Sequence, residues 1–120
     1  MFYFRSMEAC DIFTSKTEPF QEGVEYYSTG TRTPPGQITK GFINAFDLNK
    51  LDFAWRNPLI GSNFAWAGVM STATGLVAFG DDAHNFVILN GHTGIPLWHF
   101  NIGQIPRASP MSYEIGRAHV

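Results

Sequence analysis

Short stretches rich in aromatic and β-branched residues recur along the chain, some alternating with polar residues and some continuously apolar, and turn-forming residues separate them. This pattern is typical of β-strands, and no stretch has the periodicity of an amphipathic helix. The pattern therefore predicts an all-β chain. Strands are expected near residues 2–6, 42–47, 52–56, 67–72, 76–80, 85–90, 96–100 and 109–114.

Two of these stretches follow one template: a small or apolar residue, Asp or Asn two positions later, a turn, and then Trp. The first contains Ala45, Asp47, Lys50–Leu51 and Trp55, and the second contains Ile88, Asn90, Thr93–Gly94 and Trp98. The two Trp residues lie 43 residues apart, within the roughly 40–50-residue period of β-propeller blades. The repeat therefore predicts a partial β-propeller, with each Trp packed across the seam between blades.

The two repeats are predicted to differ in the geometry of their turns. Thr93–Gly94 predicts a hairpin turn in which Gly supplies a positive φ, whereas Lys50–Leu51 predicts a turn of another geometry. Asp47 and Asn90 have side chains that catalysis often uses, but their fixed place predicts that they accept hydrogen bonds from turn N–H groups. If Trp98 is buried in its seam, replacing it with Ala should cost about 3–5 kcal/mol.

Residues 14–40 form one long irregular stretch, interrupted by several Pro and Gly residues. A stretch of this length is usually functional or packs over another part of the protein. Tyr26 and Tyr27 are expected to hold it in place.

Composition and charge exclude several classes of function. The chain is 44% hydrophobic and 15% charged, and its net charge of −2 is unsuited to binding nucleic acid or an anionic membrane. A single cysteine, Cys10, excludes an internal disulfide and a cysteine-based zinc site. With no activating group nearby, a buried or half-buried thiol is expected there.

Candidate metal ligands are few. The four His residues show no metal-ligand spacing on a common element. Asp81 and Asp82 could hold a cation together with His84, but an Asp pair after Gly80 more often forms a turn. We therefore expect no metal site and no catalytic residue in this chain.

The two ends of the sequence have features of their own. The chain opens directly on a strand pattern, with no signal peptide and no transmembrane stretch, so we expect Met1 to be a truncation point. Residues 115–120 match the translation of a common sequencing-library adapter. We expect residues 1–114 to be a partial propeller and residues 115–120 to be a non-native tail.

The repeat resembles the tryptophan-docking motif of quinoprotein dehydrogenases, the alcohol and methanol dehydrogenases that use pyrroloquinoline quinone (PQQ). The segment from Phe64-Ala65-Trp66-Ala67-Gly68 through Thr72-Ala73-Thr74-Gly75-Leu76-Val77-Ala78-Phe79-Gly80 resembles that family's Trp-Gly-Gly segment and the glycine-containing strand after it. The likeness continues through Thr93-Gly94, Trp98-His99-Phe100, Gly103 and Ser109-Pro110-Met111-Ser112-Tyr113. It covers residues 1 to about 114, more loosely before the first repeat.

The resemblance implies a periplasmic parent protein with an eight-bladed propeller, of which this chain is a C-terminal part of about two to three four-stranded antiparallel blades. Such an enzyme oxidises an alcohol or polyol with PQQ and a calcium or lanthanide ion. It passes electrons to cytochrome c or a membrane quinone. The metal ligands and catalytic Asp of the family lie in blades outside this chain.

One family contact carries over residue by residue. The Trp of the Trp-Gly-Gly segment lies beside PQQ, which implies cofactor-binding roles for Trp66 and for Ala67, where the family often has Gly. From the residues alone, Trp66 is either such a pocket residue or another Trp packed between blades. An asparagine that touches the quinone in many members corresponds to Met7, a departure typical of a divergent branch. The alternative function is a non-catalytic PQQ-like propeller that serves as a binding or assembly scaffold.

Overall fold

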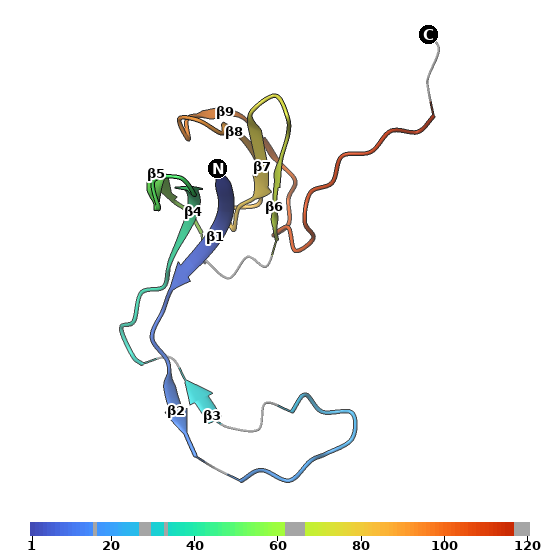
Figure 1. Cartoon of the computed structure of the whole chain (residues 1–120). Coiled ribbons are helices and arrows are strands. Elements are labelled where there is room, and N and C mark those ends of the chain that lie inside the picture. Colours follow the sequence, from blue (N-terminus) through green and yellow to red (C-terminus); the bar gives the residue numbers. More distant parts are fainter. Residues whose placement is uncertain (16, 27–29, 33, 62–66, 117–120) are drawn as a thin grey trace.

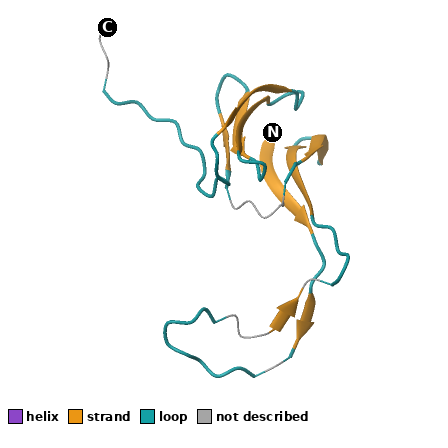
Figure 2. Cartoon of the chain, turned by 180° about the vertical axis from the view of Figure 1, so that it is seen from behind, coloured by secondary structure: helices purple, strands orange, loops and turns teal. Residues whose placement is uncertain are grey.

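A computed structural model of the chain describes residues 1–15, 17–26, 30–32, 34–61 and 67–116. All regular structure in these residues is β-strand (Figures 1 and 2), which confirms the all-β prediction. The strands are β1 (Phe2–Glu8), β2 (Ile12–Thr14), β3 (Gly30–Arg32), β4 (Lys40–Asp47), β5 (Asp52–Pro58), β6 (Val69–Ser71), β7 (Leu76–Gly80), β8 (Asn85–Asn90) and β9 (Pro96–Asn101). No helix in the described part of the chain is long and apolar enough to cross a membrane.

Two antiparallel sheets make up the body of the molecule. The first sheet has the order β1-β4-β5, and the second has the order β6-β7-β8-β9. The short pair β2-β3 belongs to an arm, residues 9–39, that extends away from both sheets (Figure 1). Short turns join β4 to β5, β6 to β7, β7 to β8 and β8 to β9, as expected for antiparallel neighbours.

The two sheets repeat each other in detail. The hairpin β4-β5 has a register shift between Ala45 and Phe46, and the hairpin β8-β9 has one between Ile88 and Leu89, 43 residues later. In both hairpins the shift places the template's first residue opposite its Trp, so that Ala45 pairs with Trp55 and Ile88 pairs with Trp98. The sequence repeat is therefore also a structural repeat.

The core lies between the two sheets. Ile43 of the first sheet packs with Val77, Phe79 and Leu89 of the second, and each of these residues is at most 3% exposed. We call this contact the inter-sheet seam. Burial of apolar side chains stabilises such a contact by roughly 25 cal/mol per Å², so the two sheets support each other.

Trp55 docks across this seam as the repeat predicted. Its ring lies against the turn between β8 and β9, so close to Gly94 that a Cβ at that position would lie 2.7 Å from the ring. Its Nε1–H donates a hydrogen bond of 2.8 Å to the carbonyl oxygen of Gly91. The first docking Trp therefore joins its own sheet to the turn of the next one.

Trp98 differs from the prediction of a buried side chain, because it is 50% exposed. Its ring lies on the face of the second sheet that points away from the seam, where it stacks on Phe100 at 6.1 Å between centroids. The position is equivalent to that of Trp55, but no sheet of the described chain covers it. The expected loss of 3–5 kcal/mol for Trp98→Ala therefore does not apply to this chain.

The arm departs from the predicted irregular stretch by forming β2 and β3. Tyr26 holds its tip as expected: the hydroxyl group donates to the carbonyl oxygen of Glu18 at 3.2 Å, and the ring meets Phe20 edge-on. Tyr27, the other expected anchor, lies outside the described residues. The strand predicted at 109–114 is wrong, because this segment is irregular and Met111 and Tyr113 are 75% and 70% exposed.

Candidate functional site

The predicted cofactor wall is described in part. Trp66 lies outside the described residues, so its predicted contact with PQQ stays a prediction. Ala67 is described and is 3% exposed, two residues before β6 begins. Its side chain is covered by the chain itself, and its predicted contact with PQQ also stays a prediction.

The segments on either side of residues 62–66 are held by specific contacts. The N–H of Leu59 donates to the carbonyl oxygen of Gly41 at 2.8 Å, which ties the first segment to β4. On the other side, the N–H of Gly68 donates to Ser109 Oγ at 3.1 Å, and a Cβ at Gly68 would overlap that hydroxyl group. The backbone before residue 62 is therefore tied to the first sheet, and the backbone after residue 66 is tied to the irregular segment at Ser109.

Gly61 shows how closely the first of these segments packs. It has a φ of +117°, a backbone conformation that side chains other than hydrogen strongly disfavour. A Cβ at Gly61 would lie 2.6 Å from the backbone carbonyl carbon and from the Cβ of Asp82. The segment thus rests directly on the turn between β7 and β8.

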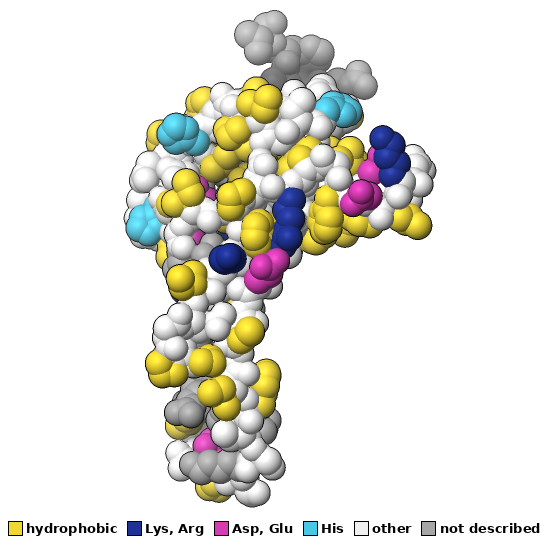
Figure 3. Space-filling view, turned by 90° about the vertical axis from the view of Figure 1, so that its left-hand side faces the viewer, with side chains coloured by type: hydrophobic (Ala, Val, Ile, Leu, Met, Phe, Trp, Pro, Cys, Tyr) yellow, Lys and Arg dark blue, Asp and Glu magenta, His cyan; other side chains and the backbone are white. Residues whose placement is uncertain are grey.

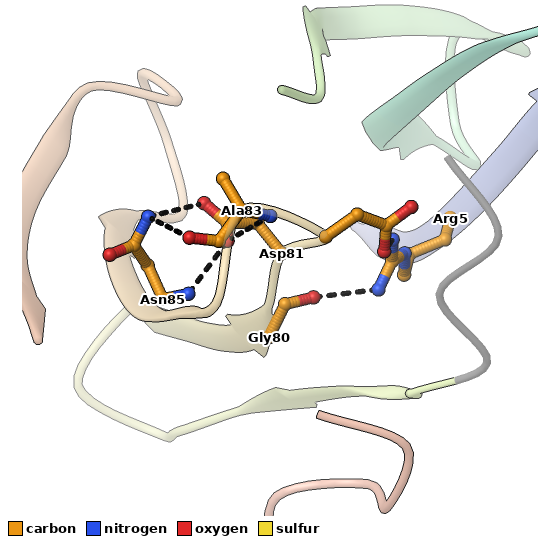
Figure 4. Close-up of polar contacts among 6 residues, drawn as sticks. Arg5, Gly80, Asp81, Ala83 and Asn85 are labelled. Carbon is orange, nitrogen blue, oxygen red and sulfur yellow. Dashed lines mark hydrogen bonds and ion pairs between the residues drawn. The ribbon is translucent and has the colours of Figure 1, made fainter. Parts of the chain in front are cut away.

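Asp81 builds this turn and is not arranged as a metal ligand. Its carboxylate accepts hydrogen bonds from the N–H groups of Ala83 and Asn85 and from the Asn85 side chain (Figure 4). His84 is exposed and adopts a φ of +69° within the turn. The described residues contain no group of three His, Cys, Asp or Glu side chains able to hold a metal ion.

Asp82 points to the other side of the turn and meets Arg5 of β1. Nη1 of Arg5 donates a 2.6 Å hydrogen bond to the carbonyl oxygen of Gly80, and Nη2 lies 3.4 Å from Oδ1 of Asp82. The Asp82 side chain is fully buried and that of Arg5 is 11% exposed. This pair was not predicted from the sequence. Arg5 lies two residues after Tyr3 on the same strand, so both side chains point to the same face. A charged side chain on the buried face of a strand indicates a buried partner.

Asp47 and Asn90 play the turn-forming role that their positions predicted. Oδ1 of Asp47 accepts hydrogen bonds from the N–H groups of Asn49 and Lys50, at 2.9 and 3.2 Å. Oδ1 of Asn90 accepts the equivalent pair from His92 and Thr93. These hydrogen bonds, first that from Asn49, lower the pKa of Asp47 from its ordinary value of 3.8.

The expectation of a different turn geometry in the first repeat is wrong. The N–H of Leu51 donates to the carbonyl oxygen of Asp47, as that of Gly94 does to Asn90, both at 2.8 Å. Leu51 adopts a φ of +55°, close to the +71° of Gly94. The side-chain and backbone hydrogen bonds of the turn therefore outweigh the steric penalty at Leu51.

Cys10 also differs from its expectation, because the thiol is exposed rather than buried. It lies at the base of the arm, between β1 and β2. The arm also exposes apolar side chains, with Phe13, Phe20 and Ile38 each more than 70% exposed, and Figure 3 shows hydrophobic side chains along its length.

A cleft of about 310 Å³ opens between the outer parts of the two sheets. It is lined by core residues, including Ile43 and Leu89, and by Asp81 and His99. The carboxylate of Asp81 is already bound by the turn N–H groups. The cleft is thus an apolar widening of the seam.

A comparison with solved structures gives the fold its context. The chain is similar to quinohemoprotein alcohol dehydrogenase ADHIIG from Pseudomonas putida HK5, with a TM-score of 0.75 and 22% identity over 95% of this chain. The fold is that of a partial propeller of such a dehydrogenase. No family model and no curated protein matches the chain.

The likeness covers 18% of the dehydrogenase chain, so it shows the fold of a section and leaves the activity of the whole protein open. The propeller prediction is confirmed. The described residues supply two of its sheets, of three and four strands.

Proposed function

We propose that this chain is a section of a PQQ-dependent quinoprotein dehydrogenase that oxidises an alcohol or polyol. The observation that carries the proposal is the likeness in fold to a quinohemoprotein alcohol dehydrogenase over nearly the whole chain. The docking of Trp55 onto the Gly91–Gly94 turn supports it, because the sequence motif that resembles the family acts here as a motif that joins sheets. In the proposed protein, the chain contributes blade packing and one wall of the cofactor site.

The proposed wall consists of Trp66 and Ala67, as the sequence resemblance implies. Ala67 is the described member of the pair, and its side chain is small and apolar. PQQ, when bound, would supply the two-electron acceptor for alcohol oxidation. The residues of this chain would exclude water and orient the cofactor, and the cation ligands and the base would come from other blades.

The remaining parts of the proposal rest on the sequence resemblance. They are a calcium or lanthanide ion beside PQQ, a periplasmic location, and cytochrome c or a membrane quinone as electron acceptor. None of them involves a described side chain of this chain.

The proposal is tested with the full-length protein that contains this chain. After loading with PQQ and Ca²⁺, it should reduce an artificial dye in the presence of alcohols or polyols, and Trp66→Ala should weaken PQQ binding more than Trp98→Ala does. No alcohol-dependent dye reduction across a panel of primary, secondary and polyhydric alcohols would refute the enzyme assignment.

A second candidate, a non-catalytic propeller scaffold, is favoured by Met7. This residue lies on β1, 53% exposed, where the resemblance places an asparagine that touches the quinone. A thioether cannot donate the hydrogen bond of an amide. A correctly folded full-length protein that binds no PQQ would support the scaffold.

A further inference from the structure

The β4-β5 turn and the β8-β9 turn share their hydrogen bonds but differ in what lies against them. In the β8-β9 turn, the ring of Trp55 packs directly on Gly94. A Cβ at Gly94 would lie 2.7 and 2.9 Å from two ring carbons and 3.0 Å from the side-chain nitrogen of Asn57. Carbon atoms in favourable contact lie about 3.5–4.0 Å apart. Docking of a Trp on this kind of turn therefore requires Gly at this position.

Leu51 occupies the equivalent position in the β4-β5 turn. Its N–H makes the same 2.8 Å backbone hydrogen bond as that of Gly94, and its φ of +55° is close to the +71° of Gly94. Its Cβ therefore stands where the ring of a docking Trp would lie. The rest of the Leu51 side chain is 74% exposed and extends the obstruction.

The two outer faces of the chain match each other in the way that the two sides of the inter-sheet seam do. Trp98 is the counterpart of Trp55, 43 residues later, and is 50% exposed on the outer face of the second sheet. Leu89 belongs to the seam, and its counterpart 43 residues earlier is Phe46, which contacts Phe53 on the outer face of the first sheet. A second copy therefore presents to Trp98 the kind of surface on which Trp55 docks, except at Leu51.

We propose that Leu51 is a specificity-determining residue of sheet docking, which stops Trp98 of one copy from docking on the β4-β5 turn of a second copy. Without this side chain the two outer faces would join head to tail, and each added copy would again leave one of each face open. With it, Trp98 fits only a turn that has Gly at the position of Gly94. The inference depends on the fold alone and goes beyond the proposed function, because it involves no cofactor.

The test compares Leu51→Gly with Leu51→Ala by sedimentation velocity over a range of concentrations. Leu51→Ala loses most of the exposed apolar side chain but keeps the Cβ, so the two variants differ by the obstructing atom. We expect Leu51→Gly to associate at a concentration about tenfold lower than the wild type does, in species that grow beyond a dimer. Leu51→Ala should associate no more readily than the wild type.

The added association of Leu51→Gly should also depend on the Trp98 ring. The double variant Leu51→Gly/Trp98→Ala should associate no more readily than Trp98→Ala alone. Equal association of Leu51→Gly and Leu51→Ala would overturn the proposal. Added association that persists in the double variant would overturn it as well.

A second comparison does not depend on association and can be made in the full-length protein that contains this chain. Gly94→Ala places a Cβ against Trp55, whereas Gly103→Ala adds one at a similar φ of +76° with no atom within 4 Å. Both variants carry the strain of a positive φ, so a larger loss of Tm in Gly94→Ala reports the contact with the Trp ring. If the two variants lose equal Tm, a Cβ is compatible with docking, and the role of Leu51 is refuted.

Discussion

Leu51 adopts the left-handed conformation that its counterpart Gly94 adopts without steric penalty. The side chain is 74% exposed, so it contributes little burial in return. We expect Leu51→Gly to raise the free energy of unfolding by about 0.5–1 kcal/mol, the steric relief minus the added chain entropy of Gly. The measurement is a urea titration followed by tryptophan fluorescence at submicromolar concentration.

Leu48 is the control for this prediction, because it lies in the same turn, is 59% exposed and has no positive φ. Leu48→Gly should destabilise the chain. If both glycine variants destabilise the chain equally, the left-handed conformation of Leu51 does not lower the stability of this turn.

Asp47 makes the first turn sensitive to acid. Because its pKa in the folded chain is lowered from 3.8, its contribution to stability is present above that value and is lost as the pH falls through the folded-state pKa. Asp47→Asn should keep the turn, as Asn90 does in the second repeat, and should lose this part of the acid sensitivity. Urea midpoints measured between about pH 2 and pH 6 test it. If the urea midpoint of Asp47→Asn falls as steeply with decreasing pH as that of the wild type, Asp47 is not a source of the acid sensitivity.

The two docking Trp residues should contribute unequally to the free energy of unfolding. Trp55 packs on Gly94 and donates to Gly91, whereas Trp98 is half exposed. We expect Trp55→Ala to lower the free energy of unfolding by about 3 kcal/mol and Trp98→Ala by about 1 kcal/mol or less. Urea titration measures both. Equal losses would mean that docking across the seam does not stabilise this chain.

Most of the strands could be predicted from the sequence. Local periodicity identifies a strand that pairs with its neighbour in the chain, and the strands at 42–47, 52–56, 76–80, 85–90 and 96–100 all form near their expected bounds. The 109–114 segment has the same pattern but no paired strand, and a strand exists only where another backbone completes its hydrogen bonds. A sequence pattern does not show whether that partner is present.

The candidate site was less predictable, for a related reason. The interpretation of Trp66 and Ala67 as a cofactor wall stays a prediction, because Trp66 lies outside the described residues. Arg5 and Asp82, in contrast, are 77 residues apart in the chain, and only the packing of the two sheets brings them together. The shared geometry of the two turns was also missed, because residue type alone ranks Leu as unsuited to a positive φ.

The whole molecule is extended and leaves both outer sheet faces uncovered. Its radius of gyration is 18.3 Å, against about 14 Å for a compact domain of this length. The outer face of the second sheet presents Trp98 and Phe100, and that of the first presents Phe2 and Phe53, all at least 46% exposed. On this first face, Oδ1 of Asn44 is buried and has no hydrogen-bond partner in the described part of the chain.

These faces should drive self-association of the isolated chain at micromolar concentrations. Trp98→Glu, which places a charge on one face, should reduce association measured by analytical ultracentrifugation. Ile38→Glu, at a 74% exposed position on the arm, should not. A chain that sediments as a monomer at all concentrations would contradict the role of the open faces.

The proposal that this chain is a section of a PQQ-dependent dehydrogenase is tested most directly by titrating the cofactor-free full-length protein with PQQ in the presence of Ca²⁺. Tryptophan fluorescence and the PQQ absorption spectrum report binding together. We expect stoichiometric, saturable binding, with fluorescence quenching that is reduced in Trp66→Phe. A folded full-length protein that shows neither quenching nor a spectral change at any PQQ concentration would contradict it.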